Sequence, residues 1–171
     1  MRVNNLEQLE TELRKRINNA LVSEVDETVK ETMMEHIISD VYEVYDPVLY
    51  TRRLNSMRNG GSGLLDGDNI KSELKNDLLL AVKNVTLGDK YVGIRKYHLS
   101  GGYTSTPKIS QNYNKPIAGV IETGQGYDVD GWEYDGVPRP FIRNTCDDLR
   151  DNHYHTIALK EGLERQGLEV K

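Results

Sequence analysis

The first part of the chain carries one long stripe of apolar residues. They recur at every third or fourth position, which is the spacing of one face of an α-helix. The stripe consists of Leu6, Leu9, Leu13, Ile17, Leu21, Val25, Val29, Met33, Ile37 and Val41. It predicts an amphipathic helix from Asn4 to Tyr45 with Asn4 or Asn5 as the N-cap. Asp46-Pro47 ends the helix, because proline disfavours helix in the residue before it.

The steady step of four in this stripe does not match the helical repeat. Four residues overshoot one turn by about 40°, so either the stripe spirals around the helix or the helix breaks. Ser23 and Asp26 have the spacing of a capping box, and we predict a break near Val22–Ser23. The stripe is expected to pack in the core. Packing between the subunits of a ring is compatible with the same pattern.

Two predicted strands follow a glycine-rich turn at residues 59–63. They run from Asn69 to Leu74 and from Asp77 to Thr86, with a tight turn near Lys75-Asn76. The second strand contains an unbroken apolar run, residues 78–82, which favours a central position in the sheet, although a run this short also fits a helix.

Residues 90–115 are expected to form a long irregular loop. The segment contains four tyrosines, the break Ser100-Gly101-Gly102 and Pro107. A loop of this length in a compact domain is usually functional. We interpret it as an arm that becomes ordered against neighbouring subunits, and an unstructured surface loop fits the pattern equally well.

The C-terminal part is predicted to end in a helix over residues 142–167. Pro138–Phe141 lead into it, Asn144 or Thr145 would cap it, and Gly167 would stop it. Before it come a short helix or strand over residues 116–123 and an acidic loop over residues 128–136.

The expected fold class is α+β in a single domain over residues 1–171. It comprises an N-terminal helical segment (1–45), which is long and kinked if the predicted break occurs. A small, mostly antiparallel sheet with the long loop 90–115 occupies residues 46–141. The C-terminal helix (142–167) packs on this sheet.

Composition narrows the possible functions. The chain has 22 basic and 27 acidic residues, a net charge of −5, and no run of lysine or arginine that marks a nucleic-acid patch. Ten tyrosines favour half-exposed contacts with other subunits. Cys146 is the only cysteine, which excludes an intrachain disulfide and a thiolate zinc cluster. No signal peptide or membrane-length apolar run appears, so we expect synthesis in the cytoplasm and no membrane partner.

Few residues have the spacing that chemistry would need. His36 and Asp40 share a helix face, which is more typical of a surface pair than of a metal site. His153 and His155 would point about 200° apart on a helix and cannot share a ligand. The acidic loop, with Asp128, Asp130, Glu133 and Asp135, could hold calcium or serve a metal-dependent hydrolase, but it lacks the EF-hand pattern. We expect no enzyme activity and no cofactor or metal.

Two motifs in a fixed order carry a family resemblance. Ile121-Glu122-Thr123-Gly124 follows the predicted sheet, and Pro138-Arg139-Pro140-Phe141-Ile142-Arg143 precedes the last helix. This order resembles the head–tail joining and minor tail component family of tailed phages, whose members carry similar motifs. The stretches Met34–Ile38 and Tyr50–Arg53 are also similar to relatives from prophages of Gram-positive hosts. Glu122, Gly124, Pro140 and Phe141 are expected to be structural, with Phe141 fixing the last helix to the sheet.

The resemblance implies a structural virion protein located in the neck or the head-proximal tail. Copies would form a ring, a hexamer or a dodecamer, together with other neck, connector and tail-tube proteins, and DNA would pass through it passively. A component of a prophage-derived contractile particle is the alternative that keeps the fold. Arg139 and Arg143 either pair with acids of a neighbour or are solvated. The expected subunit-interface residues are Tyr97, Tyr103, Tyr113, Trp132, Arg139 and Arg143.

Overall fold

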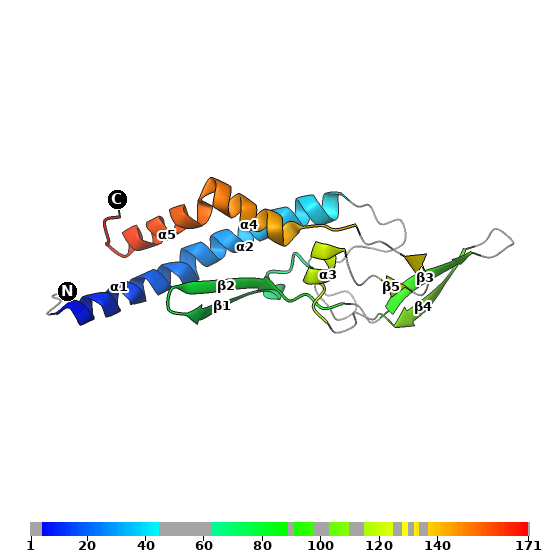
Figure 1. Ribbon diagram of the computed structural model, residues 1–171, viewed down its shortest axis with the longest axis horizontal. Helices are drawn as coiled ribbons and strands as arrows, with labels where there is room; N and C mark the ends of the chain where they lie inside the picture. Colours follow the sequence, from blue (N-terminus) through cyan, green and yellow to red (C-terminus); the bar gives the residue numbers. More distant parts are fainter. Residues whose placement is uncertain are drawn as a thin grey trace.

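The molecule is elongated, with a helical body at one end and a β-hairpin at the other (Figure 1). The computed structural model describes residues 5–44, 63–88, 91–97, 103–109, 115–124, 128–129, 132–133 and 137–170. Its mixture of a long N-terminal helix, small antiparallel sheets and C-terminal helices confirms the predicted α+β class. Among the described residues, no helix has the length and apolar character needed to cross a membrane.

One helical column forms the N-terminal segment. It consists of α1 (Leu6–Ala20), the π-helical turn η1 (Leu21–Val25), α2 (Asp26–His36) and the π-helical segment η2 (Ile37–Glu43). The predicted N-cap is confirmed at Asn5, whose Oδ1 accepts a hydrogen bond from the backbone N–H of Gln8 at 2.8 Å. The predicted end at Tyr45–Pro47 lies outside the described residues.

The predicted break near Val22–Ser23 is confirmed in position but not in form: η1 interrupts the regular α-helix there, and the chain stays helical as a π turn. The backbone N–H of Asp26 donates to the carbonyl of Leu21, five residues back. The Ser23 hydroxyl does not cap a new helix but donates to the carbonyl of Asn19 at 2.7 Å. A π turn contains more residues than an α turn. Apolar residues spaced four apart therefore stay closer to one face of the helix through η1 than they would in a regular α-helix.

The first sheet is a hairpin that lies along this column. β1 (Ile70–Asn76) pairs antiparallel with β2 (Leu79–Asn84), in a register from Ile70 opposite Asn84 to Leu74 opposite Leu80. The turn is Asp77-Leu78, two residues later than predicted. Asn18 of α1 fixes it: its Oδ1 accepts from the backbone N–H of Leu78 at 2.9 Å, and Leu78 adopts a φ of +71°.

The predicted central position of the second strand is also wrong. Within the described residues this sheet has two strands, so β2 is an edge strand. Leu78 and Leu79 are exposed, and Val82 packs against the core. The apolar run therefore consists of an exposed turn residue, an exposed strand residue and three half-buried strand residues. Hydrophobic character alone does not distinguish these positions.

The buried core lies between the second half of the column, the hairpin and the helices α3 (Ala118–Thr123) and α4 (Phe141–Asn152). Ile37 and Phe141 have no exposed surface. Other buried members are Met33, Val41, Leu64, Ile70, Ala118 and Ile121. Phe141 thus belongs to the same cluster as residues of the long helix and of β1. The helix α4 that it begins packs mainly against α2, which corrects the predicted packing of the last helix on the sheet.

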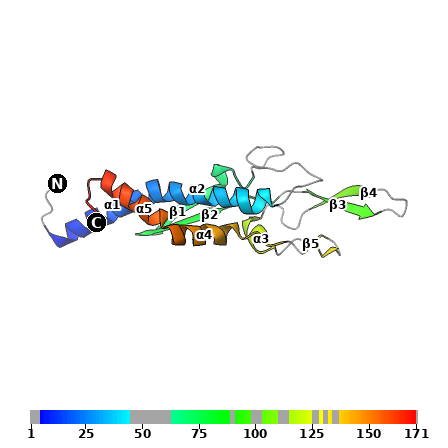
Figure 2. The same ribbon diagram turned by 90° about the horizontal axis from the view of Figure 1, so that it is seen from above.

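The C-terminal segment consists of two helices instead of the predicted single one. α4 ends at His153, whose φ of +57° places it in the left-handed region, and α5 (Tyr154–Arg165) follows. The bend lets α4 pack along α2 and α5 pack along α1 and η1, as both views show (Figures 1 and 2). Gly162 is buried at the crossing with α1. A Cβ atom there would lie 2.8 Å from the Cβ of Ala20, so a larger residue does not fit.

Candidate interaction surfaces

The two motifs of the resemblance form one junction. α3 ends at Gly124, which has a φ of +67°. The side chain of Glu122 reaches the start of α4, where its two carboxylate oxygens accept hydrogen bonds from the backbone N–H groups of Ile142 at 2.8 Å and Arg143 at 3.0 Å. The backbone N–H of Arg139 donates to the carbonyl of Ile121 at 2.9 Å. The junction holds α3 and α4 at a fixed angle.

This geometry corrects the predicted cap of the last helix. Neither Asn144 nor Thr145 caps it, because both lie inside α4, and the Thr145 hydroxyl donates to the Phe141 carbonyl at 2.6 Å. Glu122, about twenty residues earlier in the chain, supplies the acceptors that the first N–H groups of α4 need. A carboxylate at that end also interacts favourably with the helix dipole.

The two predicted interface arginines differ in their surroundings. Arg143 is on the surface, with its side chain 80% exposed and its Nε 3.8 Å from a carboxylate oxygen of Asp147. Arg139 is half-buried beside the junction and has an interaction within the chain. Arg143 is therefore the better placed of the two for a neighbouring subunit, and a contact there stays a prediction.

The described residues of segment 90–115 include two regular strands. β3 (Tyr91–Tyr97) and β4 (Tyr103–Ile109) form an antiparallel hairpin in continuous register, which corrects the predicted loop. Tyr97 lies opposite Tyr103, so two predicted interface residues are cross-strand partners at the last pair before the tip. Tyr113 lies outside the described residues. Neither strand pairs with any other strand in the described part of the chain.

The acidic loop also contains a short hairpin. β5 (Asp128–Val129) pairs with β6 (Trp132–Glu133), so Asp128 lies opposite Glu133 and Val129 opposite Trp132. Asp130 and Asp135 lie outside the described residues. No group of three metal-ligating side chains occurs among the described residues. The calcium alternative for the whole loop is not tested by them, because two of its four carboxylates lie outside the described ranges. β5 lies in the same half of the molecule as β3–β4 (Figures 1 and 2).

His36 connects the long helix to α4 through two carboxylates. Its Nδ1 lies 3.0 Å from an oxygen of Asp40, which confirms the predicted surface pair, and its Nε2 lies 3.4 Å from an oxygen of Asp148. The side-chain amide of Asn144 donates to Asp40 at 2.9 Å. Partial burial opposes the charged form of Asp40, but hydrogen bonds from Asn144, Ser39 and His36 outweigh it and lower its pKa. The cluster ties two helices together and uses both ring nitrogens, so it resembles a structural contact.

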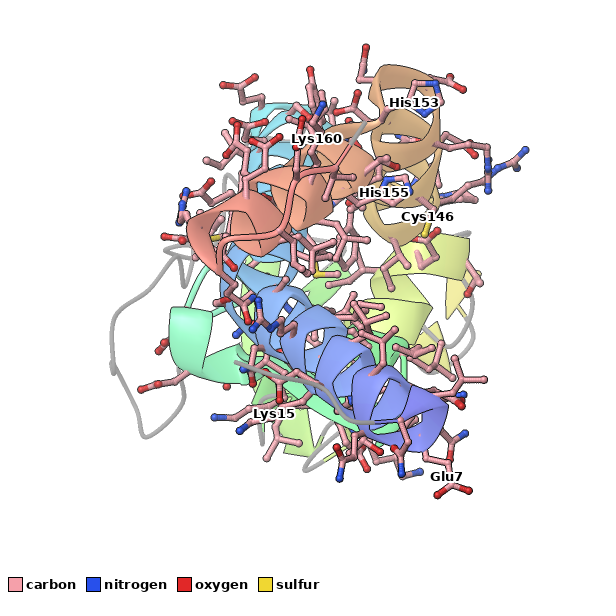
Figure 3. All side chains as sticks on the ribbon, turned by 90° about the vertical axis from the view of Figure 1, so that its left-hand side faces the viewer. Glu7, Lys15, Cys146, His153, His155 and Lys160 are labelled. Atoms are coloured by element: carbon pink, nitrogen blue, oxygen red, sulfur yellow. The ribbon has the colours of Figure 1, made fainter. Side chains whose placement is uncertain are left out.

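His153 and His155, the other two histidines among the described residues, occupy different positions at the start of α5. His153 forms the bend between α4 and α5, and His155 lies one residue into α5, where its Nδ1 is 2.9 Å from the carbonyl of Leu149 (Figure 3). Cys146 is exposed on α4. None of these residues belongs to the His36 cluster.

The structure shows an exposed apolar surface that the sequence pattern assigned to the core. Leu6, Leu9 and Leu13 occupy the first turns of α1, and Leu6 is 79% exposed. From Val25 onward the stripe is buried at every position except Val29, which is half-buried. The three exposed leucines are compatible with the prediction that the stripe also contacts another subunit.

Comparison with known proteins identifies the family. A family model described as YomN matches residues 5–165. The chain belongs to the YomN family. The SPbeta prophage-derived uncharacterized protein YomN of Bacillus subtilis (strain 168) is 33% identical over 151 residues, which cover 86% of this chain and 82% of that protein. No solved structure gives a significant match.

The YomN match confirms the coarser part of the expected resemblance, because it relates the chain to a prophage protein. The chain is accordingly a phage-associated protein. The matched region spans the motif junction, the His36 cluster and both strands of the β3–β4 hairpin. A position in the neck and a ring remain predictions.

Proposed function

We propose that this YomN family member is a non-enzymatic structural subunit of a phage particle, located in the neck or the head-proximal tail. Copies form a ring, a hexamer or a dodecamer, that joins head to tail together with connector and tail-tube proteins and lets DNA pass. The relationship to a prophage protein supports the phage setting. The order of the motifs supports the neck position.

The observation that carries the proposal is the projecting hairpin β3–β4. It extends from the body at the end away from both termini (Figures 1 and 2). Its strands pair only with each other within the described residues. A two-stranded ribbon by itself is marginally stable, and open strand edges favour pairing with another chain. A hairpin of this kind is suited to contacts in an assembly.

Deletion of the gene from the phage or prophage that encodes the chain tests the proposal. We expect DNA-filled heads and separate tails to accumulate, and a plasmid copy of the full chain to restore joined particles. In wild-type particles, mass spectrometry should detect the chain, and antibody labelling in the electron microscope should mark the junction of head and tail. Intact, infectious particles from the deletion strain, or purified particles without the chain, would contradict it.

The same experiment separates the contractile-particle alternative. A prophage-derived contractile particle has no DNA-filled head, so the chain would copurify with tail-like particles that carry no packaged DNA. That result would retain the structural role and overturn the head–tail joining role.

A further inference from the structure

Charge is unevenly distributed along the chain. Residues 90–121 contain five basic residues and no acidic one: Lys90, Arg95, Lys96, Lys108 and Lys115. The whole chain has 22 basic and 27 acidic residues, so the remainder has 17 against 27, a net charge of −10. Three of these five residues, Arg95, Lys96 and Lys108, lie on the strands of the β3–β4 hairpin, which therefore has a charge of +3 in a protein that is otherwise acidic.

The structure separates these charges in space. The hairpin lies at one end of the elongated molecule and the helical body at the other (Figures 1 and 2). Its basic positions lie on both strands: Arg95 and Lys96 on β3, and Lys108 on β4 opposite Val92. Because the hairpin projects away from the body, the opposite charges of one copy are far apart, and those of two copies can meet.

The long helix provides a surface of the opposite sign. Glu27, Glu31 and Glu35 follow one another at four-residue intervals on α2, and all three are exposed. No ion pair involves them among the described residues, whereas neighbouring Asp26 is paired with Lys30 at 2.8 Å. Like charges four residues apart on a helix repel each other. A cationic partner would relieve this repulsion.

We propose that the β3–β4 hairpin of one copy docks on the Glu27–Glu31–Glu35 surface of the next copy. The inference rests on the proposed ring and names the contact that builds it. Two different surfaces meet in this contact, so it is head-to-tail, and its repetition closes a ring when the rotation allows. Tyr97 and Tyr103 supply residue types that protein interfaces favour. A second copy is a better partner than DNA, because it offers an acidic surface, whereas the whole chain with its net charge of −5 repels a polyanion.

Self-association of the full chain at low and high salt, measured by light scattering, tests the contact. The wild type should assemble at about 0.05 M salt and weaken by about tenfold or more at about 0.5 M, where charges are screened within a few ångströms. The hairpin variant Arg95→Glu/Lys96→Glu and the body variant Glu27→Lys/Glu31→Lys should each weaken low-salt association by about tenfold or more. Combining both variants should restore it to within about threefold of the wild type.

The matched control is Lys15→Glu/Lys71→Glu. It makes the same change in net charge as the hairpin variant, at exposed body positions on α1 and β1, one of which is labelled in Figure 3. Circular dichroism checks that each variant is folded. The contact is overturned if the wild type stays monomeric up to millimolar concentration, if the hairpin variant behaves as the control, or if the combined variant shows no recovery. Binding to a short DNA duplex is measured for the same proteins. If the hairpin variant loses DNA binding but self-associates like the wild type, the hairpin binds DNA instead of a second copy.

The outcomes separate this contact from the proposed function. If antibody labelling places the chain at the neck while the charge variants assemble normally, the ring stands and the hairpin contact fails. If the charge exchange restores association but particles lack the chain, the contact stands and the neck role fails.

Discussion

The carboxylate of Glu122 is the best target for a quantitative prediction, because one side chain satisfies two backbone N–H groups at the start of α4. In Glu122→Ala both groups lose their acceptor, and the helix dipole loses a compensating charge. Loss of a side-chain cap typically costs about 0.5–2 kcal/mol, and hydrogen bonds to a charged group contribute about 1.5–3 kcal/mol each when they are well shielded. Because Glu122 is half-buried, we expect a loss of about 1–2 kcal/mol.

Urea unfolding followed by circular dichroism measures this loss, and a decrease of about 2–8 °C in Tm should accompany it for a chain of this size. Glu122→Gln keeps one acceptor oxygen without the charge and should lose less. Glu169→Ala, which removes the same charge at an exposed position after α5, is the control and should change stability by less than about 0.5 kcal/mol. Hydrogen exchange should be faster at the N–H groups of Ile142 and Arg143 in Glu122→Ala. If Glu122→Ala is as stable as the control, the junction does not depend on this cap.

Two further predictions concern the helical body. Gly162→Ala should destabilise the protein by about 1–3 kcal/mol in urea unfolding, because its Cβ would lie 2.8 Å from that of Ala20. Gly119→Ala, with nothing within 4 Å, should be neutral or slightly stabilising, and equal effects of the two would contradict the crossing. The pKa of Asp40 is lowered in the folded state, so its contribution to stability is present above its unfolded pKa and lost as pH falls through the folded one. The stability difference between wild type and Asp40→Asn, measured by urea unfolding across pH, should therefore shrink below about pH 4, and a difference independent of pH would refute this.

Local signals in the sequence predicted the elements that depend on local interactions. The N-cap at Asn5 and the pair His36–Asp40 both join residues three or four positions apart on one helix, and both are present. The motif residues Glu122 and Phe141 were recognised as structural, although the sequence did not reveal that one caps the helix that begins at the other.

The wrong predictions arise either from contacts between residues far apart in the chain or from elements that have no clear local signal. The turn at Asp77-Leu78 is fixed by Asn18, about sixty residues earlier, which no local turn pattern contains. The bend at His153 has neither glycine nor proline to mark it. The hairpin β3–β4 has little alternation of apolar and polar residues, so the pattern suggested a loop. The distribution of basic and acidic residues along the sequence nevertheless distinguishes residues 90–121, which contain no acidic residue.

The apolar stripe of the long helix shows why a correct pattern can still mislead about function. Its spacing is uniform from Leu6 to Val41, but burial is not: Leu6 is exposed, whereas Ile37 is fully buried. The α5 helix and the turn of the β1–β2 hairpin contact the column near Arg16 and Asn18, and the first turns of α1 extend past them (Figure 1). The apolar pattern therefore shows which helix positions can bury their side chains. Whether such a position is buried within the chain depends on whether a neighbouring element extends far enough to cover it. The exposed leucines lie at one end of the elongated molecule, and the hairpin, which pairs with no other strand in the described part of the chain, lies at the other end, so two separate surfaces are available for the proposed assembly.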